Sequence, residues 1–317
     1  MVSLPRVLLV AGGVGGAKLA LGLARALPPD RLVIVGNTGD DETFHGLHVS
    51  PDLDTLMYTL AGLADPERGW GLAGDTFQTL TMLERYGAPA WFRLGDRDFA
   101  THLERTYLLG QGRSLTEATR HLCQRLGVEH PIVPMSDQAV RTIVETEAGT
   151  LAFQEYFVQR RCEPRVTAIR FEGAGAARPS PDFDRALAWA DALVFAPSNP
   201  LVSIGPVLAI PGVRERLERL KGPRIAVSPL VGGQALRGPA AKMLQELGEE
   251  ASCVGVARRL AGLCDVLVID RVDAGLAEAV RAAGPAPAVR DTIMATDADK
   301  ERLAREVLDL IAQQIDR

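Results

Sequence analysis

Residues 32–41 read Leu-Val-Ile-Val-Gly-Asn-Thr-Gly-Asp-Asp, and residues 50–55 read Ser-Pro-Asp-Leu-Asp-Thr. The apolar run Leu32–Val35 is typical of a buried parallel strand, and it is followed closely by Asp40, Asp41, Asp52 and Asp54. Because ligands bind at the carboxyl ends of strands in an open α/β sheet, these acids predict a site for a hard cation such as Mg²⁺. The alternative is a solvated turn whose aspartates bond their own backbone, and the second acidic pair argues against it.

A second ligand loop is predicted near the amino terminus. The apolar strand 6–10 leads into Ala-Gly-Gly-Val-Gly-Gly-Ala-Lys at positions 11–18, and a helix follows with Leu19, Leu23 and Leu27 on one face. Glycines let the backbone approach a ligand, and amides at a helix start hold phosphate. The lysine is not followed by Ser or Thr as in a P-loop, and the third glycine of the dinucleotide fingerprint is missing, which disfavours a nicotinamide-dependent dehydrogenase. A tight structural turn is the other interpretation.

Further apolar strands are predicted over 192–196, 224–227 and 265–269, each ending in small polar or turn residues. This alternation indicates a Rossmann-like, doubly wound and mostly parallel sheet. Between about residues 95 and 180 the alternation is interrupted, and segments 142–147 and 151–159 alternate as a β-hairpin would. We therefore expect a single α/β domain over 1–317 with an inserted α+β subdomain at about 95–180. Helices are predicted over 53–63, 114–127, 213–220 and 297–315.

Composition favours a globular enzyme. Of 317 residues, 47% are hydrophobic and 24% charged, and the formal charge is −5, which argues against a nucleic-acid partner. The four cysteines lack zinc or redox spacing. The apolar run 7–11 is too short for a signal peptide or a membrane span, so we expect a cytoplasmic protein with no membrane partner.

A dense polar patch, Leu-Gly-Asp-Arg-Asp-Phe-Ala-Thr-His, occupies positions 94–102 at the predicted start of a helix running to Leu109. Asp98 and His102 lie one turn apart on that helix. Asp96, Arg97, Asp98 and His102 together offer an unusual capacity to bind a ligand, although a helix cap with a salt bridge has the same composition. The stretch Asp-Thr-Phe at positions 75–77 is expected to cap the helix that follows it. Trp70, between two glycines, is a candidate stacking platform or a core residue.

Eight motifs together resemble the 2-phospho-L-lactate transferase family, which takes part in the biosynthesis of the deazaflavin coenzyme F(420). The resemblance runs in order from the first strand to about Asp273. The motifs lie at positions 12–18, 37–41, 51–55, 94–103, 134–137, 153–157, 196–206 and 238–243.

The resemblance implies the transfer of a phosphate-linked three-carbon acid from its guanosine diphosphate ester to the ribityl hydroxyl of Fo (7,8-didemethyl-8-hydroxy-5-deazariboflavin). GMP is the implied leaving group, Mg²⁺ the implied cofactor and a homodimer the implied assembly. The family's metal-binding acids map onto Asp40 and Asp52, and its deazaflavin contacts onto Asp54 and Arg97. We expect Asp54 to orient or deprotonate the hydroxyl.

Two further sets of residues complete the expected site. Asp96 and His102 are expected to contribute to the Fo site. The guanine nucleotide is expected against the glycine loop and the Ser-Asn-Pro segment, at Gly12, Gly13, Gly15, Gly16, Lys18, Ser198, Asn199, Ser203 and Gly205.

The sequence leaves open whether the donor carries phospholactate, phosphoenolpyruvate or phosphoglycerate. A different class of function is a sugar-nucleotide-binding regulatory protein of the related gluconeogenesis-factor group, which shares the glycine loop and the Asn-bearing end of the second strand. The patch at 94–102 favours the transferase.

Overall fold

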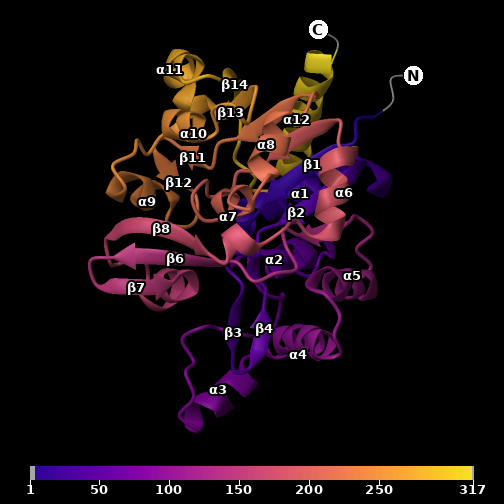
Figure 1. The fold of residues 1–317 in the computed structure, drawn as a ribbon, viewed down its shortest axis with the longest axis vertical. Helices are drawn as coiled ribbons and strands as arrows, with labels where there is room; N and C mark the ends of the chain where they lie inside the picture. Colours follow the sequence, from indigo (N-terminus) through magenta and orange to yellow (C-terminus); the bar gives the residue numbers. More distant parts are fainter. Residues whose placement is uncertain (1–3, 316–317) are drawn as a thin grey trace.

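A seven-stranded, wholly parallel sheet forms the centre of the computed structural model, which describes residues 4–315 (Figure 1). The central strands are buried apolar runs such as Val-Leu-Leu-Val-Ala, as expected of a parallel sheet covered on both faces. The predicted doubly wound fold is confirmed. In spatial order the strands are β14 (Ala286–Arg290), β13 (Val266–Asp270), β10 (Arg224–Val227), β9 (Ala192–Phe195), β1 (Val7–Ala11), β2 (Leu32–Gly36) and β5 (Ile132–Pro134).

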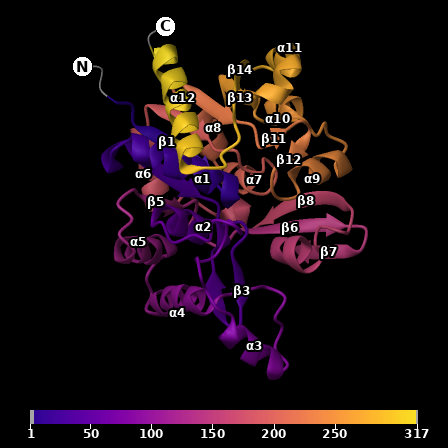
Figure 2. The same ribbon diagram turned by 180° about the vertical axis from the view of Figure 1, so that it is seen from behind.

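Helices cover both faces of the sheet because alternate residues of each strand point to opposite sides. Leu9 of β1 packs with one helical layer and Leu8 with the other. The first layer, seen in front in Figure 2, contains α1 (Gly13–Ala26), α2 (Pro51–Leu60), α5 (Leu115–Arg125) and α12 (Asp297–Ile315). The second contains α6 (Pro181–Trp189), α7 (Ile204–Leu208), α8 (Val213–Glu218), α9 (Ala240–Glu246), α10 (Cys253–Arg259) and α11 (Ala277–Ala282).

The chain reverses direction across the sheet between β1 and β9. From β1 it proceeds outward through β2 and β5, and from β9 it proceeds the other way through β10, β13 and β14. The crevice above such a switch point is where ligands bind in open α/β sheets. The loops after β1 and β9 therefore mark the expected position of a site.

Two smaller units lie beside the carboxyl edge of the sheet (Figure 1). One combines the hairpin β3 (Glu42–Phe44) and β4 (Leu47–Val49) with α3 (Gln78–Arg85) and α4 (Asp96–Gly110), around a small core that includes Leu94 and Phe99. The other is the antiparallel sheet of β6 (Arg141–Thr146), β7 (Gly149–Ala152) and β8 (Val166–Glu172). A short hairpin of β11 (Leu230–Val231) and β12 (Gln234–Ala235) follows β10.

The stretch 95–180 is divided differently from the prediction. β5 lies within it and belongs to the central sheet, while β6–β8 form the separate unit. The predicted strand over 151–159 was wrong beyond Ala152, because a π-helix spans Glu155–Gln159. Phe153 and Tyr156 are both buried, and their spacing of three is helical rather than extended.

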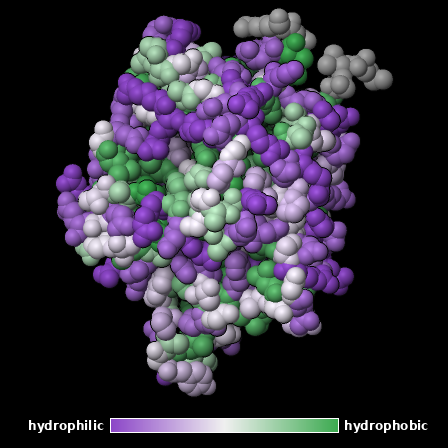
Figure 3. Space-filling model, viewed as in Figure 1, coloured by the Kyte–Doolittle hydropathy of each residue, from purple (hydrophilic) through white to green (hydrophobic). Residues whose placement is uncertain are grey.

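The α-helices of the described range 4–315 have lengths from 5 to 19 residues. None of the helices there is long and apolar enough to cross a bilayer. The face in Figure 3 is mostly hydrophilic, with apolar residues in small scattered patches.

Candidate active site

A cavity of about 720 Å³ opens at the switch point. Its floor is tied together by Ser198, whose hydroxyl accepts a hydrogen bond from the Gly12 amide at 3.0 Å and donates one to the Gly12 carbonyl at 2.8 Å. Gly13 has a φ of +65°, in the left-handed region that favours glycine. The loops after β1 and β9 thus meet at the base of the cavity.

Asp52 projects into this cavity from the first turn of α2. One of its oxygens accepts the Gly13 amide at 2.7 Å, and the other accepts the Asn37 side-chain amide at 2.9 Å. Burial raises the pKa of Asp52 to about 6 despite both hydrogen bonds. Asp52 makes no ion pair among the described residues.

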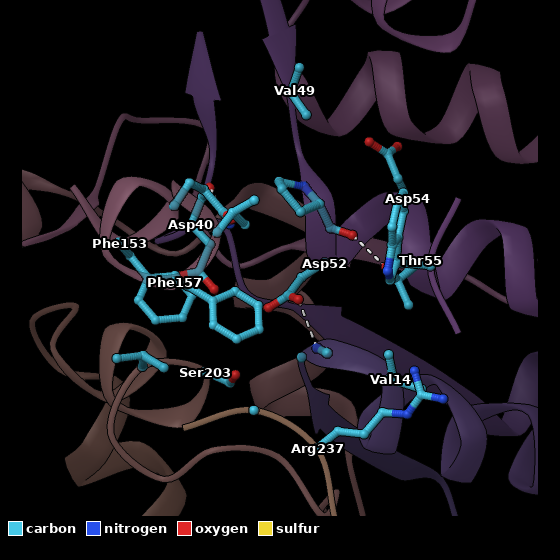
Figure 4. Close-up of a pocket in the computed structure, with 18 of the residues that line it drawn as sticks. Val14, Asp40, Val49, Asp52, Asp54, Thr55, Phe153, Phe157, Ser203 and Arg237 are labelled. Atoms are coloured by element: carbon cyan, nitrogen blue, oxygen red, sulfur yellow. Dashed lines mark hydrogen bonds between the residues drawn. The ribbon is translucent and has the colours of Figure 1, made fainter. Parts of the chain in front are cut away.

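Asp40 follows β2 and faces Asp52, as Figure 4 shows. It is only 6% exposed, and within residues 4–315 its Oδ1 atom has no hydrogen-bond partner. Burial, and then the negative charge of Asp52, raise the pKa of Asp40 well above its ordinary value. Two buried acids without a protein cation are suited to bind an external one.

The donor set fits Mg²⁺. The described residues contain no group of three or more His, Cys, Asp or Glu side chains that could hold a metal ion. Mg²⁺ commonly takes one or two carboxylates and completes its shell with water and substrate phosphates. The unpartnered oxygen of Asp40 beside Asp52 meets that requirement.

Asp54 lies two residues beyond Asp52 on α2, and its carboxylate leaves the helix in a different direction (Figure 4). It also lines the cavity, but it pairs with the buried guanidinium of Arg105 from α4. His102 and Asp98 lie on the same helix as Arg105, and both line the cavity together with Asp54.

Other predicted residues take part in the cavity wall. Ser203 lies next to Gly12 and Asp52, since a Cβ added to Gly12 would meet both side chains. Asn199 uses its carbonyl oxygen to accept the Leu201 amide at 2.9 Å, which stabilises the loop after β9. Gly15 also lines the cavity.

Five predicted site residues do not line this cavity. Gly16 packs behind it against Ser198, and Gly205 packs against Phe171. Lys18 donates to the Met294 carbonyl at 2.7 Å and lines a separate cavity of about 560 Å³, because the helical turn of α1 directs it away from the glycine loop. The ligand roles of these residues stay predictions.

Asp96 and Arg97 are the remaining two predicted site residues that do not line the cavity. They lie at the start of α4, where α3 and α4 are each capped by an aspartate at or just before the start of the other helix. Asp96 accepts the amides of Gln78 and Thr79 and so caps α3. Asp75 accepts the amides of Arg97 and Asp98 and so caps α4, whereas Phe77, in the stretch predicted to cap α3, occupies the N-cap position of that helix. Arg97 donates to the Ala73 carbonyl at 3.0 Å.

Sequence reasoning missed an aromatic wall. Trp91 and Phe92 line the cavity on one side, and Phe153 and Phe157 line it as well. Phe44 stacks on Phe92 with ring centroids 4.2 Å apart. The adjacent Trp-Phe pair in a chain with 5% aromatic residues was the available signal. Trp70 also lines the cavity and is 38% exposed, in keeping with a stacking platform.

The fold and this cavity define an α/β protein with a cavity at its topological switch point, next to paired acids. Comparison with known proteins supplies the family. Residues 7–315 match the family model described as 2-phospho-L-lactate transferase CofD, and the chain belongs to this family. The chain is therefore a transferase, as its motifs indicated.

Relatives cover nearly the whole chain. A phosphoenolpyruvate transferase of Streptomyces griseus is 45% identical over 313 residues, covering 96% of this chain and 98% of the relative. A 2-phospho-L-lactate transferase of Methanopyrus kandleri is 40% identical over 315 residues, covering 98% and 99%. The crystal structure of a UPF0052 family member from Bacillus halodurans has a TM-score of 0.62 at 14% identity, covering 98% of this chain and 100% of that one. That likeness shows a shared fold.

Proposed function

We propose that this chain transfers a phosphate-linked three-carbon acid from its guanosine diphosphate ester to the ribityl hydroxyl of Fo, releasing GMP, in coenzyme F(420) biosynthesis. The observation that carries the proposal is the facing pair of buried acids, Asp40 and Asp52, beside the glycine loop in a chain of this transferase family.

The reaction is a displacement at phosphorus. The hydroxyl oxygen of Fo bonds to the phosphorus that carries the acid, and that phosphorus loses its bond to the bridging diphosphate oxygen, which leaves with GMP. Such a transfer needs an aligned nucleophile and neutralised phosphate oxygens more than it needs a covalent intermediate.

Asp40 and Asp52 would hold Mg²⁺, which when bound supplies positive charge to the diphosphate. The amide of Gly13 already donates to Asp52, so the glycine loop and the acid are fixed relative to one another. In this proposal Asp54 orients the hydroxyl of Fo and accepts its proton. Trp91 and Phe92 of the aromatic wall, whose ring planes lie at 84° to each other, offer an apolar contact surface to the deazaflavin ring.

The donor we favour carries phosphoenolpyruvate. Relatives from Streptomyces at 45% and 43% identity have the name phosphoenolpyruvate transferase, whereas the relative from Methanopyrus kandleri at 40% has the name 2-phospho-L-lactate transferase. We also propose a homodimer, which sedimentation analysis of the purified chain tests directly.

The test is product formation. The purified chain is incubated with Fo, Mg²⁺ and either the enolpyruvyl or the lactyl guanosine diphosphate ester, and products are weighed by mass spectrometry. We expect GMP and a phosphodiester of Fo, more with the enolpyruvyl donor, and neither after chelation of the metal. Binding of a sugar nucleotide with no transfer to Fo would instead support the regulatory alternative.

A further inference from the structure

Arg105 is a charged side chain that the proposed reaction does not use. It projects from the third turn of α4 and is 1% exposed, among the largest fully buried side chains of the described residues. Burying a guanidinium is costly unless it is paired and hydrogen-bonded. Arg105 does have such partners.

The main partner is Asp54. Both terminal nitrogens of Arg105 contact this carboxylate, Nη1 to Oδ2 at 3.1 Å and Nη2 to Oδ1. Two parallel hydrogen bonds fix the plane of a carboxylate as well as its position. Asp54 is thus held in one orientation while it lines the cavity.

A second set of contacts holds Arg105 and His102 together. His102 Nδ1 lies 3.3 Å from Arg105 Nη1 and 3.7 Å from Asp54 Oδ2. Because a guanidinium can only donate, Nδ1 is the acceptor in that contact and the imidazole proton belongs on Nε2. Nε2 lies 3.3 Å from Asp98 Oδ1, which accepts the Tyr58 hydroxyl at 2.7 Å.

Asp98 is a suitable anchor for this chain of contacts. Burial alone would raise its pKa, but the contacts with His102 and Tyr58 and the charge of Arg105 lower the pKa overall. Asp98 lies beside His102 Nε2, which has no hydrogen-bond partner among the described residues, and His102 Nδ1 accepts from Arg105. The arrangement runs from Tyr58 to Asp54 through buried side chains.

We propose that Arg105 is a positioning residue for the transfer, holding the Asp54 carboxylate in the orientation that receives the acceptor hydroxyl. This inference rests on the proposed function. A purely structural ion pair has no need to face a ligand cavity, whereas Asp54, His102, Asp98 and Tyr58 all line it. A lysine keeps the charge of Arg105 but cannot make the two parallel bonds.

The first test is Arg105→Lys, with Arg216→Lys as the matched control, because Arg216 pairs with Asp184 at the surface. We expect turnover at saturating substrates to fall by at least about tenfold in Arg105→Lys, with the KM for the donor unchanged and the thermal midpoint close to that of the parent. The control should retain normal turnover. A folded Arg105→Lys with turnover within about twofold of the parent overturns the inference.

The second test works even if single variants at Arg105 are unstable. The double variant Asp54→Asn with Arg105→Met removes both charges of the pair, so no unpaired buried charge is left. It is compared with the single variant Asp54→Asn. If Arg105 acts through Asp54, the double variant turns over as slowly as Asp54→Asn alone. A further loss of about tenfold or more in the double variant contradicts that role. A parent chain that forms no product refutes the proposed function instead, so the two failures are distinguishable.

Discussion

Asp52 and Asp54 lie two residues apart on α2, yet their surroundings are opposite. Asp52 receives hydrogen bonds from two neutral groups and makes no ion pair in the described part of the chain, and burial raises its pKa to about 6. Asp54 is paired through both oxygens with Arg105. The first carboxylate has a charge that the protein does not balance, and the second has one that it does.

The difference separates two roles for buried acids at one site. An acid without a protein cation, such as Asp52 facing Asp40, is suited to bind a cation that arrives from solution. An acid held by a guanidinium fork is suited to position a substrate group. Neighbouring positions of one helix can serve both roles because successive side chains point in different directions.

The largest expected effect is on transfer. Replacing Asp40 or Asp52 with Asn should lower turnover by about a thousandfold at ordinary Mg²⁺ levels, because the charge of the diphosphate would no longer be balanced by a bound cation. Asp30→Asn is the control, since Asp30 has a side chain that is 75% exposed. Normal turnover in Asp52→Asn would remove the metal assignment.

The unfolding free energy should depend on Asp54 more than on Asp52. Asp54→Asn leaves Arg105 buried without its counter-charge and should cost about 3–5 kcal/mol of unfolding free energy. Asp52→Asn removes a carboxylate that burial already disfavours, so its unfolding free energy should stay within about 1 kcal/mol of the parent. Urea unfolding measures both, and equal losses would show that the comparison is mistaken.

The glycine loop provides a steric test of the Asp52 side of the comparison. A Cβ at Gly12 would lie 2.5 Å from Asp52 Oδ2 and 2.8 Å from Ser203 Cβ. We expect Gly12→Ala to displace Asp52 and to cost about 1–3 kcal/mol. Gly175→Ala is the control, because the space around Gly175 is open. A Gly12→Ala variant as stable and active as the control would count against the tight contact.

The smallest effect is on pH dependence. The folded chain raises the pKa of Asp52 from 3.8 to about 6, so it binds this proton more tightly than the unfolded chain does. The stability that this adds is complete at low pH and is lost as pH rises through about 6. Without metal, the parent should lose about 1 kcal/mol more than Asp52→Asn between about pH 5 and about pH 7. Parallel pH profiles of the two chains would refute this.

Much of the fold was predictable because its inner strands are continuous apolar runs. The two edge strands, β5 and β14, were not predicted. Each contains a proline, Pro134 or Pro287, which a sheet tolerates at its edge but which obscures a strand pattern, and β5 has only three residues. The motif at residues 94–102 predicted helix α4. It did not predict that Asp96 caps α3 while Asp75 caps α4, because that arrangement depends on how the two helices pack together.

The candidate site was predictable where the sequence is locally dense in glycine or aspartate. Gly12, Gly13, Asp40 and Asp52 were found in this way, and the structure brings them to one cavity. Arg105 was not found, because its partner Asp54 is 51 positions away along the chain. Lys18 was assigned to the nucleotide site because it follows the glycine loop in sequence. Its side chain lines the second cavity instead, because the direction of a helical side chain depends on its position around the helix axis.

The most direct test of the central claim is a crystal structure of the chain with Mn²⁺ and a guanine nucleotide, with anomalous scattering used to locate the metal. A manganese peak between the carboxylates of Asp40 and Asp52, in contact with nucleotide phosphate, is the predicted result. A bound nucleotide with the metal elsewhere, and with those two side chains contacting neither, would contradict the account.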